Sequence, residues 1–217
     1  MPASSAITNF EHISLEVQQS AATIILRNPP LNVIDISMME ELAQAVAEIE
    51  ARAEIFLITI RGAGKGFSAG VDVAAHTPDM VAEMLSKFHA VIRALIATNK
   101  ITIAAVHGHC LGGGAELAMV CDMVYTTSSA SWGFPEINLG CYPPVACTAL
   151  AALIGQKRAS ELILTGRTIT GSDAAAIGLA NDSVADADLE PALDRRIQEL
   201  QQLSPAALAV TKKAIYA

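Results

Sequence analysis

The pattern of hydrophobic and polar positions predicts two kinds of strand in the first half of the chain. Residues 13–17 and 22–27 are short β-rich runs that end at the breaker Asn28-Pro29-Pro30, which favours an antiparallel pair. Residues 55–60 and 101–106 are largely apolar and rich in β-branched side chains, which is typical of strands buried on both faces. Buried strands need helices to cover them, so the pattern favours an α/β fold.

Amphipathic helices are predicted between these strands. Residues 38–52 and 78–97 place apolar side chains three or four positions apart, as on one face of a helix. Ser37 and Glu40 have the spacing of a capping box, which predicts that the first helix begins after Ser37. The later part of the chain is predicted to hold two short strands and two mostly helical stretches, at residues 123–127, 131–134, 144–178 and 189–216.

Length and composition are those of a globular protein with a substantial core. The chain has 217 residues, of which 52% are hydrophobic, enough for one domain or a domain with a small appendage. No tandem repeat or low-complexity linker interrupts it. A polar stretch at residues 181–188 predicts a boundary between a core, residues 1–181, and a C-terminal helical segment, residues 182–217.

Charge, hydropathy and cysteine spacing disfavour several classes of function. The formal net charge of −8 argues against a nucleic-acid-binding surface, and no apolar run is long enough to cross a bilayer. Met1 to Ala6 lack the basic start and apolar stretch of a signal peptide, so we expect a cytoplasmic protein. No Cys-x-x-Cys pair is present, which favours buried free thiols over a metal or redox site at the four cysteines, Cys110, Cys121, Cys141 and Cys147.

Two glycine-rich segments, residues 66–72 and 109–116, each follow a strand predicted to be buried. Their glycines allow backbone N–H groups to approach a ligand closely, which is how a site for a developing oxyanion is built. The first segment matches G-x-S-x-G, but a serine hydrolase needs a histidine downstream and none follows His109. A phosphate loop is disfavoured as well, because no Ser or Thr follows Lys65.

Taken with Pro135-Glu136-Ile137-Asn138-Leu139-Gly140, these segments resemble the crotonase, or enoyl-CoA hydratase/isomerase, family. The resemblance covers nearly the whole chain and extends to three further motifs, Pro30-Leu31-Asn32, Cys121-Asp122 and Leu164-Thr165-Gly166. It implies a spiral of repeated β-β-α units and an acyl-CoA thioester substrate, with no cofactor beyond the coenzyme A that the substrate carries. It also implies an oxyanion hole whose donors, by motif, are the backbone N–H groups of Val71 and Gly113.

The resemblance assigns the chemistry to two glutamates. Glu116 and Glu136 align with the catalytic pair of hydratases, which implies that they hold water between them, Glu116 chiefly as base and Glu136 as the acid that delivers a proton to the α carbon. The remaining positions expected to contact substrate are Gly66, Phe67, Ser68, Ala69, Gly70, Asp72, Gly112 and Pro144. Two alternatives stay open: a double-bond isomerase that uses Glu136 alone, and a noncatalytic CoA-binding member of the family.

The sequence departs from the common family pattern in two places. Cys141-Tyr142-Pro143-Pro144-Val145 puts prolines where the acyl group is expected, and with residues 71–78 it is similar to cyclic dienoyl-CoA hydratases, which favours cyclohexadiene-carbonyl-CoA as a substrate. His76, within that stretch, is interpreted as a solvated loop histidine. The family implies a homotrimer or a dimer of trimers, and because the chain stops at Ala217 we expect a short C-terminal helical region.

Overall fold

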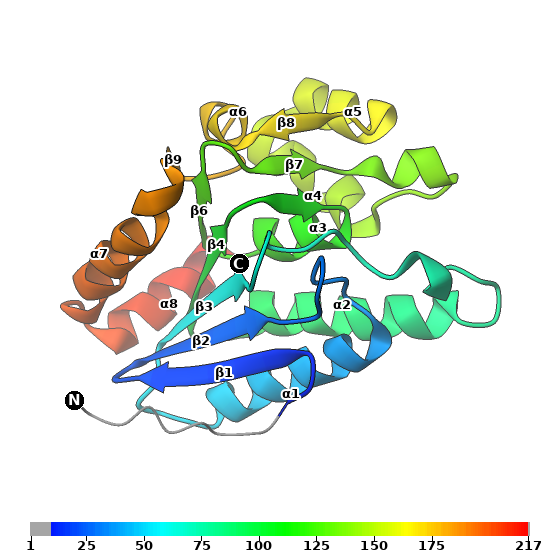
Figure 1. Ribbon diagram of the computed structural model, residues 1–217. Helices are drawn as coiled ribbons and strands as arrows, with labels where there is room; N and C mark the ends of the chain where they lie inside the picture. Colours follow the sequence, from blue (N-terminus) through cyan, green and yellow to red (C-terminus); the bar gives the residue numbers. More distant parts are fainter. Residues whose placement is uncertain (1–9, 217) are drawn as a thin grey trace.

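The computed structural model describes residues 10–216, whose strands form two sheets (Figure 1). The larger sheet contains, in spatial order, β1 (Ile13–Gln18), β2 (Ala21–Leu26), β3 (Leu57–Gly62), β4 (Ile101–Val106), β6 (Met123–Thr127) and β9 (Asp182–Val184). Only the β1–β2 pair of this sheet is antiparallel. The smaller sheet has the order β5 (His109–Leu111), β7 (Ser131–Gly133) and β8 (Thr168–Thr170).

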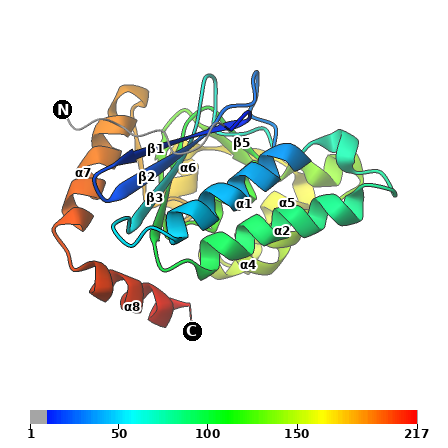
Figure 2. The same cartoon turned by 90° about the horizontal axis from the view of Figure 1, so that it is seen from below.

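Helices cover both faces of the larger sheet. Figure 2 shows α1 (Ile36–Glu50) and α2 (Val81–Ala97) running side by side under one face, while α7 (Leu189–Gln201) packs on the other, against β4 and β6. The other helices are α3 (Gly113–Met119), α4 (Pro144–Ile154), α5 (Gln156–Thr165), α6 (Gly171–Ala176) and α8 (Pro205–Ile215), with 3-10 turns η1 (Val73–Ala75), η2 (Pro135–Leu139) and η3 (Asp186–Asp188). The α/β prediction is confirmed.

Strand β4 shows why its sequence is apolar almost without interruption. Successive side chains of a strand point to opposite faces of the sheet. Ala104 and Val106 pack into the hydrophobic core that α1 and α2 cover, whereas Ile103 and Ala105 pack into a second cluster with Leu189 and other residues of α7. Both faces of β4 are therefore buried, as the sequence predicts.

Several predicted boundaries are wrong. Helix α1 begins at Ile36, because the side chain of Asp35 accepts a hydrogen bond of 2.8 Å from the N–H of Met38 and caps the helix. The predicted capping box does not form, and Glu40 pairs with Lys87 instead. The stretch 144–178, predicted as mostly helical, also contains β8, and the region after residue 181 begins with β9, which pairs with β6 in the main sheet.

A buried ion pair fastens α8 to the core. The Nζ of Lys212 lies 2.8 Å from Oδ2 of Asp122, and it also donates to the carbonyl oxygens of Leu95 and Lys100. The same carboxylate oxygen accepts hydrogen bonds from the backbone N–H and the hydroxyl of Thr102 on β4. Lys212 is only 4% exposed, so each charge depends on the other for its stability.

The remaining sequence predictions concern the two chain ends, the cysteines, membrane spans and metal sites. Met1 to Ala6 and Ala217, which carry the expectations about the two chain ends, lie outside the described residues. Cys110 and Cys121 are buried free thiols as predicted, but Cys147 is exposed and Cys141 is partly exposed. Within residues 10–216, no helix is long and apolar enough to cross a membrane, and no group of three or more His, Cys, Asp or Glu side chains is placed to hold a metal ion.

Candidate active site

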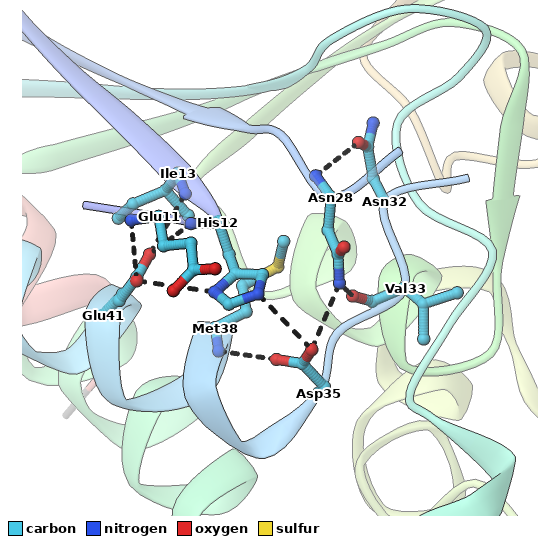
Figure 3. Close-up of polar contacts among 9 residues, drawn as sticks. All are labelled: Glu11, His12, Ile13, Asn28, Asn32, Val33, Asp35, Met38 and Glu41. Atoms are coloured by element: carbon cyan, nitrogen blue, oxygen red, sulfur yellow. Dashed lines mark hydrogen bonds and ion pairs between the residues drawn. The ribbon is translucent and has the colours of Figure 1, made fainter. Parts of the chain in front are cut away.

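Asn32 joins the loop after β2 to the loop after β3. Its side-chain NH2 group donates to the carbonyl oxygens of Ala63, Gly66 and Phe67 at 2.8, 2.9 and 3.2 Å. The side-chain oxygen of Asn32 accepts from the N–H of Asn28 at 3.1 Å (Figure 3). Asn32 is 2% exposed and has a φ of 52°, a left-handed conformation that asparagine tolerates better than most residues. These contacts fix the first glycine-rich segment in place.

Ser68 supports the same segment from inside. Its hydroxyl donates to the carbonyl oxygen of Asn32 at 2.7 Å and accepts from the N–H of Gly70 at 3.1 Å, and the residue is fully buried. Gly70 has a φ of 110°, which a residue with a Cβ atom rarely adopts. The serine of the G-x-S-x-G match is therefore a structural residue that shapes a turn.

The turn leaves the N–H of Val71 without a partner. Ile34 donates to the carbonyl oxygen of Gly70 at 2.9 Å and accepts from the N–H of Asp72 at 3.1 Å. Ile34 thus bonds to the residues on both sides of Val71, so the N–H of Val71 points the other way. No acceptor for it is found among residues 10–216.

Gly113 supplies a second unpaired N–H beside the first. It is the first residue of α3, where backbone N–H groups have no partner within the helix. An added Cβ at Gly113 would lie 3.3 Å from the nitrogen of Val71, which shows how close the two segments come. The described residues offer no acceptor for the N–H of Gly113 either. Two such donors can stabilise an oxygen that gains negative charge during a reaction.

Gly113→Ala tests this close approach. The new methyl group would lie 2.4 Å from Cγ2 of Val71, so one of the two segments has to move. We expect kcat/KM to fall by about tenfold or more, because the two donors no longer converge on one oxygen. Steady-state kinetics of the variant beside Gly64→Ala give the comparison: alanine is strained there by a φ of 72°, but its Cβ meets no atom within 4 Å and Gly64 does not line the cavity described next. Equal kinetics for the two variants would contradict the arrangement.

Val71 and Gly113 both line a cavity of about 320 Å³. Its two carboxyl groups come from α3 and η2, which place Glu116 and Glu136 in the wall. Its apolar wall comes largely from α2, through Met84, Leu85 and Phe88. The cavity is therefore suited to a substrate that carries an apolar group next to a reacting polar one.

Glu116 is almost completely buried and caps a helix from another part of the chain. Its Oε1 accepts from the N–H groups of Val145 and Ala146 at 2.8 and 2.9 Å, in the first turn of α4. That helix begins at Pro144, as the sequence predicts, and has no capping side chain of its own. Burial raises the pKa of Glu116 to about 7, and repulsion from Glu136 adds to the rise while the two N–H groups oppose it.

Glu136 is half-buried and less constrained. Its Oε2 is buried and has no hydrogen-bond partner among the described residues. Its Oε1 would be 2.6 Å from a Cβ at Gly112, so a glycine there leaves room for the carboxylate. Burial raises the pKa of Glu136, whereas its own backbone N–H and the charge of His76 lower it. An unpartnered carboxylate in a cavity can exchange a proton with a ligand.

The structure divides the other predicted substrate contacts into two groups. Ala69, Gly70, Gly112 and Pro144 line the cavity together with Val71, Gly113 and the two glutamates. The residues that do not line it are Gly66, Phe67, Ser68 and Asp72. Phe67 is fully buried in the core, and Asp72 caps η1 through a hydrogen bond from the N–H of Ala74.

The sequence interpretation missed two residues of the site. His76 lines the cavity, although its place in a loop favoured a solvated side chain. The supporting role of Asn32 was not predicted either, because its three acceptors lie more than thirty residues away in the chain. The only sign in the sequence that His76 lies near the site is that it follows Gly70 and Asp72 of the first glycine-rich segment by a few residues.

Known proteins resemble this chain along most of its length. A family model described as enoyl-CoA hydratase/isomerase matches residues 16–217. A probable enoyl-CoA hydratase of Mycobacterium bovis is 35% identical over 209 residues, which are 95% of this chain and 81% of that protein. A cyclohexa-1,5-dienecarbonyl-CoA hydratase of Thauera aromatica is 31% identical over 200 residues, 92% of this chain and 77% of that protein. The crystal structure of an enoyl-CoA hydratase from Bacillus anthracis superposes with a TM-score of 0.91 at 30% identity and covers 94% of this chain and 82% of its own.

Proposed function

The chain belongs to the enoyl-CoA hydratase/isomerase family and is a hydratase-type lyase, and from this premise we propose that it adds water across a C=C bond conjugated to a CoA thioester. The observation that carries the proposal is the meeting of four groups in one cavity: the unpaired N–H groups of Val71 and Gly113, and the carboxyl groups of Glu116 and Glu136. The N–H pair serves as the oxyanion hole and the carboxyl pair handles the protons.

In the proposed step, the water oxygen bonds to the β carbon while Glu116 takes one proton from that water. The electron pair of the C=C bond moves toward the thioester, and negative charge grows on the carbonyl oxygen that faces the N–H groups of Val71 and Gly113. Glu136 delivers a proton to the α carbon, which gives the β-hydroxyacyl thioester. Passage of one proton from Glu116 back to Glu136 closes the cycle. A pKa of about 7 makes both forms of Glu116 available near neutral pH.

The acyl group in this proposal is apolar and compact. Phe88, Met84 and Leu85 form one wall of the cavity, and Pro144 also lines it. Cyclohexadiene-carbonyl-CoA is the cyclic candidate, supported by the paired prolines at 143 and 144 and by the relative from Thauera aromatica that is named for that substrate. Linear short-chain enoyl-CoA thioesters are the comparison substrates.

One contact favours a second candidate function, a double-bond isomerase that uses Glu136 alone. One carboxylate oxygen of Glu116 accepts the hydrogen bonds that cap α4, which is also what a residue with a purely structural role would do. Glu136 has a free oxygen with which to move a proton between two carbons of a substrate. An isomerase of this kind would not add water.

A panel of linear and cyclic enoyl-CoA thioesters separates these functions. We expect loss of the conjugation absorbance together with a product heavier by one water molecule. Rearrangement without a mass gain would replace the hydratase with the isomerase, and binding without turnover of any thioester would favour a noncatalytic family member. The double variant Glu116→Gln with Glu136→Gln, incubated with the same panel, controls for uncatalysed hydration.

A further inference from the structure

The loop between β2 and α1 runs beside residues 68–72, the donor segment, which carries the N–H of Val71. The N–H of Ala69 donates to the carbonyl oxygen of Leu31 at 3.0 Å. Ile34 continues this pairing through its two hydrogen bonds to the residues on either side of Val71. The direction in which the N–H of Val71 points therefore depends on where Ile34 is held.

One side chain holds Ile34 from both sides. The side-chain NH2 group of Asn28 donates to the carbonyl oxygen of Val33 at 2.9 Å and to Oδ2 of Asp35 at 3.2 Å (Figure 3). Val33 and Asp35 are the two neighbours of Ile34 in the chain. We call these two hydrogen bonds the clamp. Because both start from one nitrogen, they are lost together when that nitrogen is replaced.

Both ends of the clamp are anchored. The backbone N–H of Asn28 donates to the side-chain oxygen of Asn32 at 3.1 Å, and its carbonyl oxygen accepts from the backbone N–H of Asn32 at 2.7 Å. At the other end, Oδ1 of Asp35 accepts from the N–H of Met38 and belongs to the first turn of α1. The clamp therefore closes the loop between the end of β2 and the start of α1.

We propose that Asn28 is a positioning residue for the oxyanion hole: by clamping the loop on both sides of Ile34, it fixes the direction in which Val71 presents its N–H to the substrate. The N–H of Gly113 is placed by α3 instead, so the two donors are held by different parts of the chain. The effect on turnover rests on the proposed function, but the pairing of Ile34 is a property of the resting protein and is measured without substrate.

Hydrogen exchange tests the clamp in the resting protein. In Asn28→Asp, a carboxylate oxygen replaces the NH2 group and faces the carbonyl oxygen of Val33 and the carboxylate of Asp35, so both hydrogen bonds are lost. The amides of Ile34 and Asp72 join the loop to the donor segment. We expect both amides to exchange about tenfold faster or more, because local opening becomes easier.

A second substitution supplies the rescue. In Asn28→Asp with Asp35→Asn, the donor and the acceptor change places, and an asparagine caps a helix as well as an aspartate does. Exchange at Ile34 should return toward the wild-type rate, although not in full, because the carbonyl of Val33 stays unpaired. Asp35→Asn alone completes the double-mutant cycle and accounts for the lost charge 3.8 Å from Nε2 of His12. A double variant that exchanges as fast as Asn28→Asp overturns the clamp.

Turnover and a spectroscopic signature separate positioning from a merely structural role. With crotonyl-CoA as probe, we expect kcat to fall by about tenfold in Asn28→Asp and to recover in part in the double variant, because a displaced donor stabilises the developing charge less well. The second probe is acetyl-CoA labelled with ¹³C at its carbonyl, which has no C=C bond to hydrate. Its bound carbonyl stretching frequency should lie below the value in water for the wild type and move back toward it in Asn28→Asp.

Asn181→Asp is the matched control. The side-chain oxygen of Asn181 accepts from the N–H of Val124 at 2.7 Å, which a carboxylate does equally well, and Asn181 does not line the cavity. Exchange at Ile34, kcat and the carbonyl frequency should all match the wild type. Unchanged exchange in Asn28→Asp overturns the proposal, as do equal changes in Asn28→Asp and Asn181→Asp.

Two further outcomes have a defined meaning. If Asn28→Asp loses its thermal unfolding transition, Asn28→Ala, which removes the donor without adding a charge, is compared with Asn181→Ala in the same measurements. Faster exchange with an unchanged kcat and an unchanged carbonyl frequency would make Asn28 a structural residue only and overturn its positioning role. A wild-type protein without turnover of any enoyl-CoA would contradict the proposed function, while the exchange rates still decide whether the clamp holds Ile34.

Discussion

Replacing Glu116 by glutamine is expected to lower the rate of hydration by about a thousandfold, because a positioned general base contributes on that order. The amide keeps an oxygen in the position of Oε1, where it can still accept from the N–H groups of Val145 and Ala146. Helix α4 therefore keeps its cap and the cavity keeps its shape. The loss should appear in kcat, with KM for the thioester nearly unchanged.

The same substitution should stabilise the folded protein above pH 7. The pKa of Glu116 rises from an ordinary value of 4.5 to about 7 on folding, so the unfolded chain releases this proton first. Between these two pH values the folded state binds more protons, and the contribution of Glu116 to stability falls as the pH rises. Above pH 7, keeping Glu116 ionised in the folded protein costs up to about 3 kcal/mol of folding free energy. Glutamine does not titrate, so the variant lacks this cost.

Two measurements check this prediction. In denaturant unfolding, the free energy of unfolding of Glu116→Gln relative to the wild type should be higher at pH 8 than at pH 5. Glu16→Gln, at an exposed position on β1, should show the same pH dependence as the wild type. Stability that runs parallel to the wild type across this range would contradict the burial argument. Retained isomerisation of an enoyl-CoA by the variant would show that Glu136 acts alone.

Asn32→Ala is expected to cost about 3 kcal/mol or more of folding free energy, since several buried carbonyl groups lose a donor at once. Those of Ala63, Gly66 and Phe67 all receive hydrogen bonds from the one side chain. Alanine also fits poorly at a φ of 52°. The segment that carries Val71 loses its attachment, so turnover should fall together with stability.

Denaturant unfolding and kinetics on the remaining folded protein measure both effects. Asn99→Ala is the matched control, because Asn99 is exposed in the short connection between α2 and β4. It should change the free energy of unfolding by less than about 0.5 kcal/mol, as is usual for surface positions. A loss below about 1 kcal/mol in Asn32→Ala would mean that water replaces the missing donors and that Asn32 does not hold the segment.

The sequence predicted those parts of the fold whose signal is local. The apolar residues of β4 reflect burial on both faces, and Gly70 and Gly112 mark positive φ angles of 110° and 51° that a turn requires. Strands β5 and β8 were missed because each has three residues and is ordered by its pairing with β7, not by its own pattern. Short strands of this kind are invisible to periodicity.

The sequence predicted which residues form most of the candidate site, but not the contacts that position them. That Glu116 caps α4 follows from contacts across about thirty residues of chain. The first helix begins before Ser37 because the side chain of Asp35 accepts from the N–H of Met38, and a capping motif in sequence does not say which of two nearby polar residues becomes the cap. Whether His76 lines the cavity depends on the direction of its loop, which the local sequence does not specify.

The buried pair of Asp122 and Lys212 has a consequence for synthesis of the chain. Asp122 follows the helix that begins with Gly113, and Thr102 on β4 already engages its carboxylate. During translation this carboxylate is made long before its cation, so a nascent chain carries an uncompensated charge beside β4 until α8 has been synthesised. The incomplete chain should therefore remain partly unfolded and accessible to chaperones and proteases, and complete its folding only after Lys212 has been synthesised.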